Sequence, residues 1–158
     1  MNKDTKVIDL EKVVIKFAGD SGDGMQLTGS QFTETSALLG NDLATFPDFP
    51  AEIRAPLGTV AGVSGFQVHI GNTEINTPGD IADVLVAMNP AALKANKNWI
   101  KKGGTIIINS DAFAKKDLDK AGYENNPLED GSFSGFNIAE APISNLTQET
   151  LKGSGLDG

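Results

Sequence analysis

The feature that most constrains this chain is an apolar run that ends in a glycine-rich turn and continues into a helical pattern. Residues 13–18 (VVIKFA) are short, apolar and rich in β-branched side chains, which is typical of a buried strand. Residues 19–24 (GDSGDG) are typical of a turn. Apolar and small residues then recur at helical spacing: Met25, Gly29, Phe32, Ser36 and Leu39. This pattern predicts a strand, a tight turn and a helix that packs closely on a sheet.

The remainder of the chain alternates predicted strands with predicted helices. Strands are expected at residues 65–70 (half-exposed), 82–88, 105–109 and 136–139. Helices are expected from Pro90 to about Lys102, with Asn89 as cap and Gly103 as stop, then at 112–120 and from 145. Residues 122–135 are rich in turn formers. The alternation predicts a three-layer α/β/α fold with a mostly parallel sheet.

The glycine-rich turn is a candidate anion site. The first amides of a helix lack partners within the helix, and the helix dipole adds partial positive charge there. Gly22 and Gly24 would let a phosphate approach these amides, and Ser21 could donate a hydroxyl. The turn matches neither the dinucleotide glycine pattern nor the Walker pattern. The alternative therefore remains that the turn is a tight strand-to-helix connection that binds no ligand. We expect Asp20 and Asp23 to point away from the anion site or to cap the helix.

A second candidate lies in a proline-rich segment. Residues 45–62 are predicted to form a long irregular loop, stiffened by three prolines within residues 46–56. Arg54 is the single arginine of the chain, and its planar guanidinium suits carboxylate or phosphate. We expect it to face a ligand or partner, with an internal pair such as one with Glu52 as the alternative.

Composition narrows the functional classes further. The net charge of −8 argues against nucleic acid or an anionic membrane as a partner. The chain has no cysteine to hold an iron–sulfur cluster or form a disulfide, and its one histidine makes a zinc site improbable. No apolar run approaches a membrane span, and the N-terminus lacks a signal-peptide core, so a cytoplasmic location is expected. We expect His69, Trp99 and Tyr123 to be structural, and no catalytic triad can be assembled.

Two long segments resemble the 2-oxoacid:ferredoxin oxidoreductase family. Residues 14–29 (VIKFAGDSGDGMQLTG) look like the opening of the alpha subunit of its 2-oxoglutarate type. Residues 41–47 and 49–56 (FPAEIRAP) look like its second signature, and residues 63–69 and 88–92 extend the match. The resemblance implies the fold of the gamma domain, spanning residues 1–158 as one domain. Because the chain stops just after a helix begins, we expect it to be a fragment of a longer subunit.

The resemblance also implies a reaction and its cofactors. Such enzymes oxidatively decarboxylate a 2-oxoacid to an acyl-CoA and pass electrons to ferredoxin, using thiamine diphosphate, magnesium, iron–sulfur clusters and coenzyme A. The turn is similar to the segment that faces coenzyme A, which makes the expected cofactor-binding residues Gly19, Asp20, Ser21, Gly22, Asp23, Gly24, Met25 and, as a second candidate, Arg54. Other domains and the beta subunit of the complex would be the partners.

The chain departs from a complete subunit in two respects. The family's Pro-Ile-Thr-Pro segment of the thiamine domain is missing, as are cluster cysteines. The domain is therefore expected to hold no catalytic or metal-binding residue and to be inactive alone. Two other interpretations remain: a stand-alone dinucleotide-binding domain, and a structural assembly domain that docks through Phe46 and Phe49.

Overall fold

A single mixed sheet organises the molecule. The computed structural model describes residues 9–49 and 62–152. The strands are β1 (Lys12–Asp20), β2 (Asp42–Asp48), β3 (Val63–Gly71), β4 (Ala82–Ala87), β5 (Ile100–Asn109) and β6 (Asn137–Ala141). The helices are α1 (Met25–Leu38), α2 (Pro90–Asn96), α3 (Lys115–Lys120) and α4 (Ile143–Leu151), with short 3-10 turns η1 (Lys97–Trp99) and η2 (Ser110–Ala112). The strand order is β2-β3-β1-β4-β5-β6.

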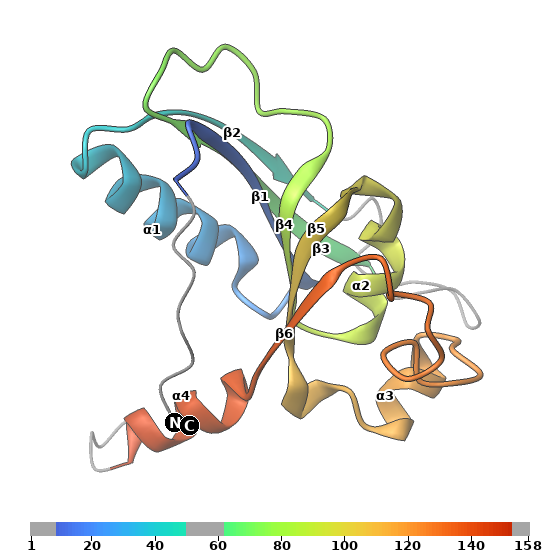
Figure 1. Cartoon of the computed structure of the whole chain (residues 1–158). Coiled ribbons are helices and arrows are strands. Elements are labelled where there is room, and N and C mark those ends of the chain that lie inside the picture. Colours follow the sequence, from blue (N-terminus) through green and yellow to red (C-terminus); the bar gives the residue numbers. More distant parts are fainter. Residues whose placement is uncertain (1–8, 50–61, 153–158) are drawn as a thin grey trace, which may run out of the picture.

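The strand directions confirm the predicted fold class. β1, β4, β5 and β6 are parallel neighbours, whereas β3 runs antiparallel to both β1 and β2. Helix α1 lies on one side of the sheet, and α2 and α3 lie on the other (Figure 1). The result is an α/β fold in three layers with a mostly parallel sheet.

Each face of the sheet has its own core. On the α2 side, Ala18, Leu85 and Ile106 are fully buried together with Leu93 of the helix. On the α1 side, Phe17, Phe66 and Val68 pack with Met25. The strands are buried on alternate sides because neighbouring residues of a strand point to opposite faces.

Helix α1 packs closely on the sheet, as the small residues of its stripe predict. Gly29 is buried, and a Cβ at this position would overlap the ring of Phe66. Ser36, further along the same face of the helix, is also buried. Leu39 is an exception: it follows the helix as its C-cap and is 77% exposed, so its predicted burial is wrong. The helix ends at Leu38, before its stripe can continue.

The predicted helix to Lys102 is too long. Helix α2 begins as expected, with the Asn89 side chain accepting a hydrogen bond from Ala92 N and Pro90 in the first turn. It ends at Asn96, and Ile100 already pairs with Ala82 as the start of β5. Gly103 lies within β5 with φ of 76° and does not stop a helix. Pairing with β4 overrides the helical propensity of the lysines.

Two strands differ from the predictions. The start of the loop expected at residues 45–62 is wrong, because residues 45–48 belong to the edge strand β2. An edge strand tolerates Pro47 because a missing amide there need not break a ladder. β3 lies between β2 and β1 and is largely buried through Gly65–Val68, so its half-exposed prediction is wrong. The part of the predicted loop at 50–61 lies outside the described residues.

Candidate functional site

The glycine-rich turn joins the end of β1 to the start of α1. The amide of Asp23 donates to the carbonyl of Asp20 across 3.0 Å, and the amide of Asp20 donates to Asp23 Oδ2 across 2.7 Å. Gly24 is the N-cap of α1 with φ of 71°, a left-handed conformation that favours glycine. These bonds fix the path of the chain from strand to helix.

The two aspartates of the turn are held by a neighbouring helix end. Asn89 Nδ2 donates to Asp20 Oδ1 across 3.0 Å and to Asp23 Oδ2 across 3.4 Å. Neither carboxylate caps α1, because the helix has no side-chain cap bond. Of the two arrangements expected for these aspartates, capping of the helix is therefore wrong, and both carboxylates accept from Asn89 instead. The sequence pattern predicted Asn89 only as the cap of the helix that follows it, yet in the fold Asn89 also links α2 to the turn.

The start of α1 is open toward solvent. Ser21, Gly22, Asp23 and Gly24 are exposed, whereas Met25 is 3% exposed and anchors the helix in the core. A Cβ built at Gly22 or Gly24 would meet no atom within 4 Å. The first turn of α1 also contains no acidic residue. The turn can therefore receive an anionic group without displacing a side chain of the described residues, which fits a phosphate group.

A small hollow lies beside this turn. It has a volume of about 120 Å³ and is lined by Asp20, Asn89, Pro90, Ala91, Asp117, Lys120 and Ala121. Sites for whole cofactors usually enclose roughly 300–1,000 Å³. By itself, this hollow is therefore too small to enclose a whole cofactor.

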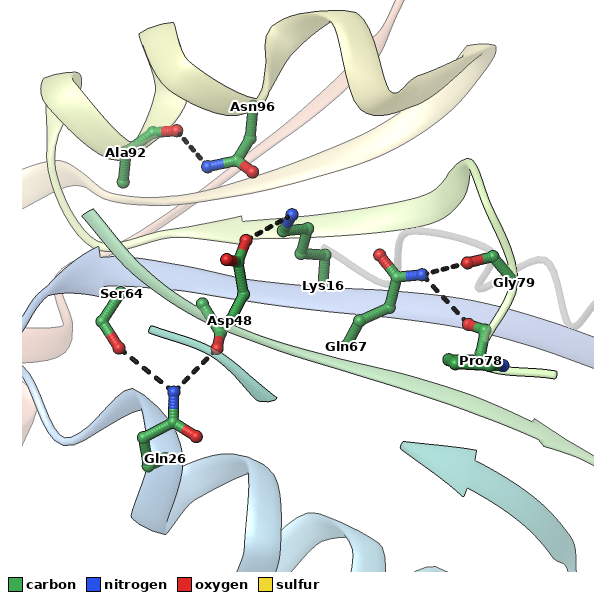
Figure 2. A network of polar contacts seen from close by, with 10 residues as sticks. Lys16, Gln26, Asp48, Ser64, Gln67, Pro78, Gly79, Ala92 and Asn96 are labelled. Atoms are coloured by element: carbon green, nitrogen blue, oxygen red, sulfur yellow. Dashed lines mark hydrogen bonds and ion pairs between the residues drawn. The ribbon is translucent and has the colours of Figure 1, made fainter. Parts of the chain in front are cut away.

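A larger hollow is separate from the turn. It has a volume of about 510 Å³ and lies between the sheet and the end of α2. Lys16 Nζ pairs there with Asp48 Oδ2 at 3.2 Å. The buried Gln67 donates to the carbonyls of Pro78 and Gly79, and the buried Asn96 donates to Ala92 O (Figure 2). These bonds hold the two amide side chains in place, and Phe46, Val63 and Trp99 give the same hollow an apolar part.

The other candidate residues have structural surroundings or lie outside the described part. His69 Nδ1 lies 2.7 Å from Thr77 O, which confirms a satisfied structural histidine. Trp99 is 54% exposed, so its predicted packing role is wrong. Arg54 and Glu52 lie outside the described residues.

Among residues 9–49 and 62–152, no group of three or more histidine, cysteine, aspartate or glutamate side chains could hold a metal ion. The same residues contain no helix of the length and hydrophobicity that crossing a bilayer requires.

Comparison with known proteins identifies the family. The model of the pyruvate ferredoxin/flavodoxin oxidoreductase family matches residues 14–156. The chain belongs to this family. Within it, the chain is 57% identical over 146 residues to the 2-oxoglutarate oxidoreductase subunit KorA of Mycobacterium tuberculosis. That match covers 92% of this chain and 22% of KorA, so the chain spans about a fifth of that relative.

Solved structures of this oxidoreductase family share the fold. The 2-oxoglutarate:ferredoxin oxidoreductase of Magnetococcus marinus, with 2-oxoglutarate, coenzyme A and succinyl-CoA bound, aligns with a TM-score of 0.68 at 26% identity, covering 89% of this chain and 22% of that one. A keto/oxoacid ferredoxin oxidoreductase gamma subunit from Geobacter sulfurreducens aligns with a TM-score of 0.62 at 18% identity, covering 89% of this chain and 66% of that one. The pyruvate oxidoreductase subunit PORC of Thermotoga maritima aligns with a TM-score of 0.60 at 16% identity, covering 90% of this chain and 68% of that one.

Proposed function

We propose that this chain is the gamma-type domain of a longer subunit of a 2-oxoglutarate:ferredoxin oxidoreductase, and that its glycine-rich turn faces coenzyme A. The observation that carries the proposal is the open start of α1, where a Cβ at Gly22 or Gly24 would meet no atom within 4 Å and no side chain caps the helix. The family membership and the coenzyme A in the Magnetococcus enzyme support it.

The residues of the turn would bind and orient the cofactor. Amides at the start of α1 would donate to a phosphate group of coenzyme A, and the helix dipole would favour its negative charge. Asn89 would hold the carboxylates of Asp20 and Asp23 through its amide group, which keeps the turn in shape. Arg54 is the second candidate for the same cofactor. Coenzyme A, when bound, supplies the thiol that accepts the acyl group.

The reaction itself would be carried out elsewhere in the complex. The chain has no cysteine, so thiolate-bound iron–sulfur clusters would belong to other parts of the enzyme. Thiamine diphosphate and magnesium would bind other domains, and electrons would leave for ferredoxin through the assembled complex, including the beta subunit. We place the complex in the cytoplasm.

Two glycine variants, one in the turn and one outside it, test the role of the turn. Gly22→Val should weaken coenzyme A binding at least tenfold, because the side chain would occupy the approach to the helix amides. Gly135→Val is the matched control, since Gly135 is also exposed, has open space around it and has no positive φ. Binding is measured by isothermal titration of the assembled enzyme with coenzyme A. Unchanged affinity in a folded, assembled Gly22→Val enzyme would overturn the assignment.

A further inference from the structure

The hollow between the sheet and the end of α2 has an ordered polar floor. Three of its side chains stand in one row, because the strand register pairs Lys16 of β1 with Gln67 of β3, and Gln67 with Phe46 of β2. Asn96, at the end of α2, lies across from this row (Figure 2). The volume of about 510 Å³ lies within the roughly 300–1,000 Å³ that is typical of sites for small ligands. We call this space the α2 hollow.

The hydrogen bonds of Gln67 and Asn96 fix the orientation of both amide groups. The carbonyl oxygens of Pro78 and Gly79 can only accept, so the side-chain nitrogen of Gln67 must face them. For the same reason, the side-chain nitrogen of Asn96 must face the carbonyl oxygen of Ala92. The two side-chain oxygens therefore point the other way, into the space between α2 and the sheet (Figure 2).

These two oxygens lack donors although their side chains are buried. Gln67 is 7% exposed and Asn96 is 5% exposed, yet neither oxygen accepts a hydrogen bond from the residues that the structure describes. Within residues 9–49 and 62–152, Tyr123 Oη is the one fully enclosed side-chain polar atom without a partner. The oxygens of Gln67 and Asn96 are therefore accessible, and the space that they line is the α2 hollow. Acceptors held in this way are pre-organised for a ligand that donates hydrogen bonds.

The charges and aromatic rings around the α2 hollow favour a cation. Lys16 is neutralised by Asp48, whose Oδ2 lies 3.2 Å from Lys16 Nζ, and Asp80 adds a further negative charge to the lining. Phe46 and Trp99 also line the hollow and are 53% and 54% exposed, so their rings are available to a ligand. The face of an aromatic ring attracts cations. The lining thus combines fixed acceptors, excess negative charge and aromatic surface.

We propose that the α2 hollow binds a guanidinium group. A guanidinium is planar and positively charged, carries several N–H donors in one plane and stacks on aromatic rings. Its donors suit the oxygens of Gln67 and Asn96, and its plane suits the ring of Trp99. A bare metal ion would fill only a small part of the volume, and an anion would face the amide oxygens. The hollow is separate from the turn, so this proposal does not depend on the assignment of coenzyme A.

A small guanidinium probe tests the chemistry of the site. Ethylguanidinium and N-ethylurea have nearly the same shape, but only ethylguanidinium is charged. Saturation-transfer NMR measures their affinities for the purified assembled enzyme. Where the hollow serves a free guanidino compound, we expect ethylguanidinium to bind at least tenfold more tightly than N-ethylurea.

Variants locate the bound probe in the α2 hollow. Trp99→Ala removes the stacking surface, and Asn96→Leu removes one acceptor at similar volume, so each should weaken ethylguanidinium at least fivefold. Trp99 is exposed, so Trp99→Ala gives a folded protein even where Asn96→Leu does not. Asn98→Ala is the control, because Asn98 is exposed on the same 3-10 turn as Trp99 but does not line the hollow. Its affinity for the probe should not change.

A photo-crosslinker separates a free compound from the other source of the same chemistry, an arginine side chain of another domain or subunit. p-Benzoylphenylalanine in place of Trp99 reacts on illumination with C–H groups that lie against the hollow. Crosslinks to an arginine elsewhere in the enzyme identify the side chain as the ligand, whereas probe binding without such crosslinks identifies a free compound. The proposal is overturned when no arginine is crosslinked and ethylguanidinium either binds no better than N-ethylurea or ignores the substitutions at Trp99 and Asn96. Coenzyme A titration of the same preparation tests the proposed function separately.

Discussion

Tyr123 combines a buried hydroxyl with a perturbed ionisation. Its oxygen is buried and finds no hydrogen-bond partner among the described residues, while Lys94 Nζ lies 5.1 Å from the ring centroid. Burial, with a smaller contribution from the charge of Asp130, raises the pKa of Tyr123 to about 12 from 10.0. The protein therefore keeps the phenol neutral at pH values at which the unfolded chain ionises it.

This shift predicts a stability loss at alkaline pH. A raised folded-state pKa means that the folded protein binds the proton more tightly, so stability is full below pH 10 and falls between pH 10 and 12. In Tyr123→Phe this part of the fall should vanish, with stability at pH 7 unchanged or raised by up to about 1 kcal/mol because an unpaired hydroxyl is removed. Urea unfolding across this pH range measures both. Identical alkaline profiles in the two proteins would contradict the argument.

At the scale of elements, the turn and α2 depend on each other through one side chain. Asn89 Oδ1 accepts from Ala92 N at 2.9 Å and so caps α2, while Nδ2 reaches both aspartates of the turn. The side-chain oxygen of Asn89 is the acceptor that the helix amide requires, and the side-chain nitrogen is the donor that the two carboxylates require. Neither alanine nor aspartate provides both.

Two variants separate these roles. Asn89→Ala should lower the free energy of unfolding by about 1 kcal/mol through the lost cap. Asn89→Asp keeps an acceptor for the cap but places a third carboxylate beside Asp20 and Asp23, so its loss should shrink as salt screens the repulsion. Urea unfolding at low and high ionic strength measures both variants. A loss in Asn89→Asp that does not change with salt would argue against contact with the turn.

At the scale of the whole molecule, the edge strand β2 presents apolar surface. Phe46, within this strand, and Phe49, directly after it, are 53% and 68% exposed. This exposure agrees with an assembly surface, one of the roles that the sequence left open. Interfaces favour exposed aromatic side chains of this kind.

Phe49→Ser should therefore weaken assembly while leaving the domain folded. Surface substitutions usually change stability by no more than about 0.5 kcal/mol, so a large loss of assembly would come from the interface. Leu38→Ser, at the far end of α1 and 88% exposed, is the control. Sedimentation of the purified subunits measures association. Equal assembly in both variants would remove Phe49 from the interface.

The sequence by itself determined the local features of this protein. Three features could be predicted because each depends on neighbours a few residues away. They are the β-branched run before Gly19, the small residues of α1 and the helix start at Asn89–Pro90. Two long motifs also sufficed to indicate the family, which the match over residues 14–156 confirms. The assignment of the turn residues and Arg54 to coenzyme A remains a prediction.

Only the tertiary structure decided the features that depend on pairing across the chain. Ile100 begins a strand because it pairs with Ala82 of β4, and residues 42–48 form an edge strand because they pair with β3. The link from Asn89 to Asp20 joins residues 69 positions apart, a distance that no local pattern encodes. Burial follows the same logic: adjacent residues of one strand differ because separate layers cover its two faces.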